Sequence, residues 1–315
     1  YQYVDDTWAQ VGQDIDGEAA GDYSGFSVSL SADGRIVAIG AKSNHNGIDI
    51  GIGPGHVRIY QYEDDTWSKM GQDIDGETTD DWSGNSVSLS SDGLTVAIGA
   101  RQNDGNGENS GHVRIYQYVD DTWAQVGQDI DGEAAGDGSG NSVSLSADGR
   151  SVAIGAPAND GNGDYSGHVR IYQYVDDTWT KVGQDIDGET AGDGSGNSVS
   201  LSADGRSVAI GAVGNGDNSG HVRIYRLDNT ISISSLQSID LDEGGAIDIT
   251  LSATHKDGDA LSYTVDAIDA QKGTLVLKAG TESTYTYTPA SYYNTDFTFD
   301  YTVTDSIGAS AVGTV

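Results

Sequence analysis

The chain has 315 residues, no cysteine, and 49 acidic residues against 15 lysines and arginines, for a net charge of −34. Without cysteine it cannot form disulfides or thiolate metal sites. The negative charge argues against nucleic acid and anionic membrane surfaces as partners, and no apolar run approaches the ~18 residues of a membrane span.

One pattern is repeated four times along the first part of the chain. Tyr-Gln-Tyr begins at residues 1, 60, 116 and 172, and it fades to Tyr225-Arg226-Leu227. Between these points lie a TW segment, DIDGE, SVSLS, an Asp-Gly pair, VAIGA, a variable loop and GHVRIY. A period of this length predicts an array of supersecondary units. We expect a domain at 1–228 with units at about 1–59, 60–115, 116–171 and 172–227.

Each repeat predicts four short strands. Residues 142–146 and 151–156 alternate apolar with small or polar side chains, and Asp148-Gly149 between them predicts a type I′ hairpin turn. The segment 169–172 and the region around Trp179 supply two further strands. Four strands per repeat, with no helical period, are typical of a β-propeller blade.

The SVSLSADG, VAIGA and GHVRIY segments resemble the FG-GAP repeat family over residues 1–227. The resemblance implies β-propeller blades related to the integrin α head, with roles in adhesion and ligand binding. Its calcium loop of D-x-D-x-D-G type is replaced here by Ser-Ala-Asp-Gly, so that site is not carried over. The ends of the array suit closure of a four-blade ring. Because the chain starts without Met inside a repeat, a segment of a longer array is the alternative.

A second domain is expected at 229–315, where the repeat stops and six or seven short strands predict an Ig-like β-sandwich. Residues 232–315 resemble the cadherin-like domains of bacterial surface adhesins, which implies a spacer stiffened by calcium. The resemblance implies calcium ligands at Glu243, Asp257, Asp259 and Asp305. His255 and Lys256 stand where that family usually has an acid, so an Asp-Gly turn with solvated carboxylates remains the alternative.

The repeated DIDGE segment is a second calcium candidate. Its acids are Asp14, Asp16, Glu18, Asp73, Asp75, Glu77, Asp129, Asp131, Glu133, Asp185, Asp187 and Glu189. D-x-D-G matches part of an EF-hand loop, but the remaining ligand spacing does not. The alternative is a structural turn in which Asp accepts backbone N–H bonds. The GHVRIY histidines lie beside arginines, which disfavour a bound cation, so we expect them to be strand-edge residues.

Two aromatic residues are candidates for ligand binding. One tryptophan per repeat is expected to pack in the core. Trp82 and Tyr23 differ, because they occupy a loop position that is glycine in the other two repeats. An aromatic side chain in a variable loop can stack on a sugar ring.

Taken together, these patterns predict an all-β protein outside the cell or on its surface, without enzymatic activity, since catalysis usually needs one asymmetric constellation. The expected role is structural or adhesive, with a rigid repeat platform and a spacer. Expected partners are a cell-surface protein or glycan, or further copies in an oligomer or filament. The alternative is a carbohydrate-binding, lectin-like module of a larger secreted protein. A propeller hydrolase is disfavoured by the lack of unique acids or histidines.

Overall fold

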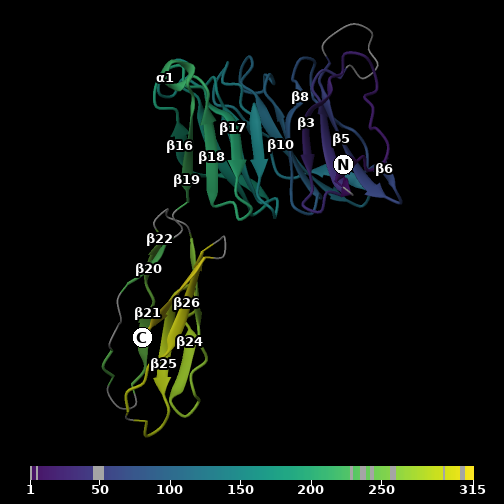
Figure 1. The fold of residues 1–315 in the computed structure, drawn as a ribbon. Helices are drawn as coiled ribbons and strands as arrows, with labels where there is room; N and C mark the ends of the chain where they lie inside the picture. Colours follow the sequence, from purple (N-terminus) through teal and green to yellow (C-terminus); the bar gives the residue numbers. More distant parts are fainter. Residues whose placement is uncertain are drawn as a thin grey trace. The chain divides into compact units, whose positions relative to one another are not determined.

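The protein divides into two compact units, Tyr1–Arg226 and Leu227–Val315 (Figure 1). The computed structural model describes residues 2–4, 6–44, 53–227, 230–234, 239–241, 245–255, 260–293, 295–305 and 309–315. The prediction of an all-β fold is confirmed, apart from a single-turn helix α1 (Asn215–Asn218) in the described chain. No helix in these ranges has the length and hydrophobicity that crossing a membrane requires.

In the described residues, the first unit contains four antiparallel sheets of the propeller-blade type, in addition to a two-stranded hairpin. The first blade contains β3 (Ser24–Leu30), β4 (Ile36–Ala41), β5 (His56–Glu63), β6 (Thr66–Lys69) and β7 (Ile74–Asp75). The second contains β8 (Ser83–Leu89), β9 (Thr95–Ala100), β10 (His112–Val119), β11 (Thr122–Gln125) and β12 (Ile130–Asp131). The third contains β13 (Ser142–Leu145), β14 (Ser151–Ala156), β15 (His168–Val175) and β16 (Thr178–Asp187). The fourth contains β17 (Ser195–Leu201), β18 (Ser207–Ala212) and β19 (His221–Arg226).

The Asp-Gly turns differ from the predicted type. Only Gly149 has positive φ, at 70°, whereas a type I′ turn needs positive φ at Asp148 as well. Instead, the Asp148 carboxylate accepts hydrogen bonds from the Ser146 hydroxyl at 2.6 Å and from the Arg150 backbone N–H at 3.0 Å. The type I′ prediction is therefore wrong, because a side-chain acceptor stabilises a longer loop that needs only one left-handed residue.

Successive blades pack through the same interface three times. Val57 and Ile59 of β5 share a buried cluster with Val87 and Leu89 of β8. Matching residues of the second and third blades pack against the third and fourth. Beside each cluster a serine hydroxyl donates to a glycine carbonyl of the next blade at 2.8 Å, from Ser27, Ser86 and Ser142 to Gly84, Gly140 and Gly196. Each blade is therefore stabilised by its neighbour as well as by its own strands.

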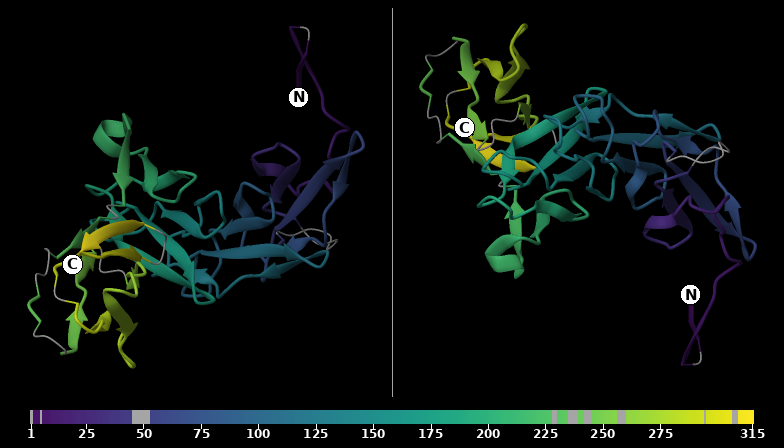
Figure 2. Two further views of the ribbon diagram at one scale, coloured as in Figure 1. Left: turned by 90° about the horizontal axis from the view of Figure 1, so that it is seen from below. Right: turned by 90° about the horizontal axis from the view of Figure 1, so that it is seen from above.

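The four blades form an open series. Figure 2 shows the sheets following one another in chain order, with the first and fourth at opposite ends. A hairpin of β1 (Gln2–Val4) and β2 (Thr7–Ala9) precedes the first blade. Val28 and Leu30 of the first blade are exposed, and so are Val222 and Ile224 of the fourth. The expectation of a closed four-blade ring is therefore corrected, because these apolar faces do not meet.

The second unit is the expected Ig-like sandwich. Its strands are β20 (Ile231–Ile233), β21 (Ile247–Thr250), β22 (Ala253–His255), β23 (Leu261–Val265), β24 (Gly273–Leu277), β25 (Thr284–Pro289), β26 (Asp300–Asp305) and β27 (Ser310–Thr314). They form one two-stranded sheet and two three-stranded sheets, β21-β25-β24 and β23-β26-β27. Ile249, Tyr287 and Val303 lie in their shared core.

Candidate functional site

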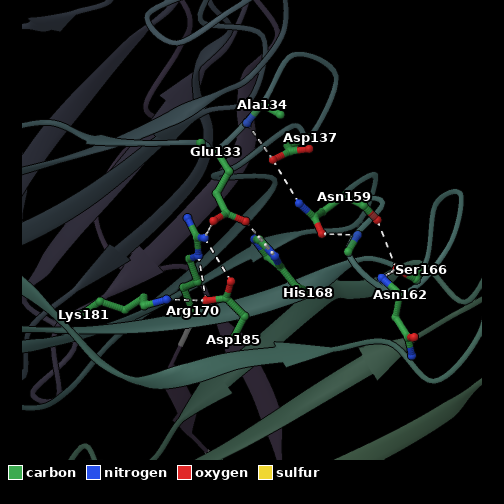
Figure 3. Close-up of polar contacts among 12 residues, drawn as sticks. Glu133, Ala134, Asp137, Asn159, Asn162, Ser166, His168, Arg170, Lys181 and Asp185 are labelled. Carbon is green, nitrogen blue, oxygen red and sulfur yellow. Dashed lines mark hydrogen bonds and ion pairs between the residues drawn. The ribbon is translucent and has the colours of Figure 1, made fainter.

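A node of charged side chains recurs where consecutive repeats meet, and Figure 3 shows the copy on the third blade. The Arg170 guanidinium donates to both carboxylate oxygens of Asp185, at 2.9 and 3.0 Å. It also forms an ion pair with Glu133. Lys181 lies 2.8 Å from Asp185, and His168 Nδ1 lies 3.8 Å from Glu133. The arginine is thus held between two carboxylates.

Strand periodicity positions the members of this node. His168 and Arg170 are two residues apart on β15, so their side chains lie on the same face of the sheet. Lys181 and Asp185 lie on the adjacent strand β16, and Glu133 comes from the preceding repeat. The first blade places His56, Arg58, Lys69, Asp73 and Glu18 in the same way. The node therefore joins one repeat to the next.

Burial favours the neutral form of three node histidines, His56, His112 and His168. Burial and the neighbouring Arg114 lower the pKa of His112 to about 4, and burial and Arg58 lower the pKa of His56. Burial raises the pKa of the Asp73 carboxylate, whereas its ion pairs lower it. The hydrogen bonds from Arg58 and Lys69 outweigh burial and lower the pKa of Asp73 below its usual value. The node thus combines a neutral histidine with acidic and basic side chains that are paired with one another.

The same clusters contain the atoms that a metal ion would need. In each of three clusters, one ligand atom of a glutamate, a histidine and an aspartate lies within 4.8 Å of the others. The clusters are Glu18–His56–Asp73, Glu77–His112–Asp129 and Glu133–His168–Asp185. In the first and third, however, an arginine already binds both carboxylates. A cation would have to displace that arginine or share its two carboxylates against charge repulsion.

The acids of one DIDGE segment do not converge on a single point. Instead, Glu18 of the first segment meets Asp73 of the second through Arg58. Glu77 and Glu189 lie 3.5 and 3.9 Å from Arg114 and Arg223 in matching positions. Calcium at the twelve acids of these segments stays a prediction.

A further aspartate in each repeat stabilises a loop. Asp137 is buried, and its carboxylate accepts hydrogen bonds from the Ala134 N–H at 3.0 Å and from the Asn159 amide at 3.1 Å (Figure 3). The Asn159 side chain in turn accepts from the Gly161 N–H at 2.8 Å. This is the behaviour of an aspartate that organises a turn.

Three of the four calcium candidates in the sandwich, Glu243, Asp257 and Asp259, lie outside the described residues. The fourth, Asp305, is buried. Its carboxylate accepts a hydrogen bond from the Ala309 N–H at 2.8 Å and lies 3.5 Å from His255 Nε2. Calcium at this end of the sandwich stays a prediction.

The two candidate aromatics occupy a strained loop position. Tyr23 and Trp82 have φ of 55° and 59°, and their glycine counterparts Gly138 and Gly194 have φ of 64° and 59°. Side chains other than glycine rarely adopt this region, and such strain often marks a functional position. Tyr23 is 65% exposed, whereas Trp82 is half-buried.

Two cations that the sequence did not single out lie beside Trp82. Lys42 Nζ lies 4.3 Å from the Trp82 ring and 3.6 Å from the Phe26 ring, and Arg101 Cζ lies 5.8 Å from Trp82. Lys42 and Arg101 occupy the position directly after VAIGA, where the other repeats have proline and valine. This difference between the repeats was the sequence signal that could have identified the two cations. Tyr165, also with positive φ and 65% exposed, was missed as well.

Two protein families match the chain. Residues 74–116 match the FG-GAP repeat, and residues 227–315 match the bacterial Ig domain. The FG-GAP match runs from β7 to β10, and the Ig match begins at Leu227, where the second unit begins. Both domain types are typical of extracellular or surface proteins.

Similar solved structures include three β-rich proteins of low sequence identity. One is a putative 6-phosphogluconolactonase from Bacteroides uniformis, with 14% identity, 64% of this chain and 55% of that chain covered, and a TM-score of 0.40. A periplasmic gluconolactonase from Pseudomonas aeruginosa has 14% identity, coverage of 92% and 84%, and a TM-score of 0.36. The β-propeller domain of the Trilobed protease from Pyrococcus furiosus has 9% identity, coverage of 91% and 77%, and a TM-score of 0.36. The chain thus spans about half the length of the first structure, and no curated protein matches it.

Proposed function

We propose that this protein is an extracellular structural or adhesive module, in which the FG-GAP array is a rigid platform and the Ig domain is a spacer. The observation that carries the proposal is the recurrent inter-repeat node. Its arginine joins carboxylates of two repeats, so the node links each repeat to the next. A platform built in this way presents loops at fixed spacing, and variable loops are where binding specificity commonly lies.

The proposed role is not enzymatic. The histidine that resembles a general base is buried, and burial lowers its pKa. The carboxylates nearest to it are bound by arginine. A general base must reach a substrate proton and have a pKa near the working pH, and the buried His56, His112 and His168 have neither property. The same node in successive repeats supports a mechanical role.

The test is an adhesion measurement on the full chain. Beads coated with the folded protein should be retained on cell surfaces, and beads coated with the heat-unfolded chain serve as the matched control. Retention that is lost after protease treatment of the cells would identify a protein partner. Loss after glycosidase treatment would identify a glycan. Equal retention of folded and unfolded chains, or none on any surface, would contradict the adhesive role.

The second candidate function is glycan binding, and the cluster of Lys42, Arg101 and Trp82 favours an acidic sugar. Two cations in a chain with so few lysines and arginines stand beside an aromatic ring and near the exposed loop that carries Tyr23. The variant Lys42→Gln/Arg101→Gln should lose binding to carboxylated glycans on an array. Arg150→Gln, at an exposed turn, is the control that should retain it. Equal binding by both variants would exclude this site.

A further inference from the structure

The contact between consecutive repeats has three parts, all repeated inside the array: two join neighbouring blades, and the third completes one blade with strands from two repeats. The first is the apolar contact with its glycine approach. Gly84 lies so close to the preceding blade that an added Cβ would stand 2.6 Å from the carbonyl oxygen of His56 and 3.2 Å from Val57. Gly140 and Gly196 meet the carbonyls of His112 and His168 at 2.5 Å in the same way.

This part is missing its partner at both ends of the array. Gly25, the first-blade counterpart of Gly84, has nothing within 4 Å. At the other end, Gly211 meets only its own Ser198, whereas Gly40 meets the backbone of Gly84. The apolar residues at this end are uncovered as well. Val222 and Ile224 are 68% and 75% exposed, whereas their first-blade counterparts Val57 and Ile59 are fully buried.

The second part is a tryptophan anchor. Trp123 donates from Nε1 to the Met70 carbonyl at 2.8 Å, and the Gln72 side chain donates to the Trp123 carbonyl at 2.8 Å. An added Cβ at Gly71 would stand 2.9 Å from the Trp123 ring. Trp67 and Trp179 repeat this arrangement on the segments that precede them.

The tryptophan of this anchor is also uncovered at one end of the array, and the site that would receive it is open at the other. Trp8 is 68% exposed, in contrast to 3% for Trp123. Its missing socket has the sequence Val182-Gly183-Gln184, which is the counterpart of Met70-Gly71-Gln72. Gly183 has nothing within 4 Å, so the place that a tryptophan ring fills in the other repeats is open.

The third part is strand pairing with its ion pair. Val57 of β5 pairs with Ile74, and Arg58 Nε donates to Asp73 at 3.2 Å. On β19 the counterpart Arg223 has a buried Nε to which the structure assigns no partner among the described residues. Ile15 and Asp14 are the counterparts of Ile74 and Asp73, and they precede the first blade.

We propose that these two ends are the halves of one interface, through which a second copy of this chain docks head to tail. The head face comprises Trp8, Ile15, Gly25, Val28 and Leu30. The tail face comprises Gly183, Gln184, Gly211, Val222, Arg223 and Ile224. The inference deepens the proposed structural role and rests on it.

A second copy is the occupant because the head face carries the residues that the internal interfaces use. The docked contact would continue an interface that the chain already forms three times. Because the two faces differ, association is heterologous and produces a ring or a filament. Tyr1–Tyr3 and Tyr225–Leu227 are equivalent positions of the repeat. On docking, the end of β19 of one copy would therefore take the place of β1 of the other copy.

Charge makes the association salt-dependent. Each copy carries a net charge of −34, so copies repel one another at low ionic strength. Screening shortens the range of this repulsion from ~10 Å at 0.1 M salt to ~3 Å at 1 M. Salt should therefore promote docking, which is the opposite of what an interface held by opposite net charges would show.

The experiment is analytical ultracentrifugation of the full chain over a range of protein and salt concentrations. Ile224→Glu places a charge on the tail face and Leu30→Glu on the head face, both at positions exposed in the single chain. Val276→Glu, exposed on the Ig domain, is the matched control. Circular dichroism and thermal unfolding establish that all variants are folded.

We expect the wild type and Val276→Glu to form multimers that grow with protein and salt concentration. Ile224→Glu and Leu30→Glu should each be monomeric, with affinity reduced at least tenfold. Mixed together, they should form a 1:1 dimer and nothing larger, because one supplies an intact head face and the other an intact tail face.

Three results would overturn the proposal. A wild type that stays monomeric under all conditions would show that the faces do not bind a second copy, whether other repeats cover them or the ring closes on itself. Multimers formed by both variants would place the contact elsewhere. A mixture that stays monomeric while the wild type assembles would exclude head-to-tail pairing. A monomer that still adheres to cells would leave the proposed adhesive role intact.

Discussion

Interior and terminal blades have nearly the same sequence but differ in burial. Leu89 in the second blade is buried, while Leu30, at the same place in the first, is exposed. Ile59 is fully buried, and its counterpart Ile224 is three-quarters exposed. Local sequence therefore makes the strand, but the neighbouring blade determines how much of it is buried. Each blade has one face that packs on the blade before it and one that packs on the blade after it. In an open series, one of these faces stays uncovered at each end.

The largest difference between interior and end is expected at the tryptophans. Trp123→Ala should lower the free energy of unfolding by about 3–5 kcal/mol, because it removes a buried ring. Trp8→Ala should change it by less than about 0.5 kcal/mol in the monomer, as expected for an exposed position. Urea denaturation at low protein concentration compares the two variants. Equal losses would mean that Trp8 is buried in the single chain.

The interior node should make stability depend on pH. His112 has a pKa lowered to about 4 by burial and Arg114, while in the unfolded chain it titrates near 6.5. Between these values the unfolded state binds the additional proton, so stability is complete above pH 6.5 and falls by about 3 kcal/mol as the pH drops to 4.

Chemical denaturation of the wild type and His112→Gln across this range measures the effect. The variant should lose the part of the slope that His112 contributes, and a slope that is unchanged would contradict a neutral buried imidazole. Asp73 and Asp185, whose pKa values are lowered by their ion pairs, add a further loss of stability at more acidic pH in both proteins.

A matched pair of glycines separates backbone strain from the inter-blade contact. Gly127 and Gly183 both have φ near 70°, so alanine is strained at both positions. At Gly127 the new Cβ would also stand 2.8 Å from the Trp179 ring, whereas at Gly183 nothing lies within 4 Å. Gly127→Ala should therefore be less stable than Gly183→Ala by about 1–3 kcal/mol in thermal unfolding of the monomer. Equal stabilities would indicate that the Gly183 socket is already occupied.

The smallest expected effect is that of calcium on the array. Arginine binds both carboxylates of the first and third nodes, so a chelator should leave the unfolding temperature of the array within experimental error. Differential scanning calorimetry with calcium and with chelator measures this for the full chain. A clear rise in the unfolding temperature of the array on adding calcium would contradict this expectation and support the DIDGE acids as ligands.

The blades were predictable because apolar alternation and turn residues are local signals. The type of the Asp-Gly turn was not, since the Asp148 carboxylate accepts bonds that sequence patterns do not show. Ring closure was not predictable either, because Val222 has the same sequence context whether or not another blade covers it. The ion-pair node was missed since its carboxylates, such as Glu18 and Asp73, come from different repeats. The Lys42 cluster was missed because its members lie on separate loops.

Amide hydrogen exchange at one leucine of each blade tests the central claim most directly. The backbone N–H groups of Leu89, Leu145 and Leu201 each donate to a serine hydroxyl of the preceding blade, at 2.9 Å. Leu30 is their counterpart in the first blade, and no described residue of a preceding blade supplies its acceptor. In the monomer, the Leu30 amide should exchange much faster than the other three, and it should become protected when copies associate. Protection of Leu30 equal to that of Leu89 in the monomer would contradict an open series of blades.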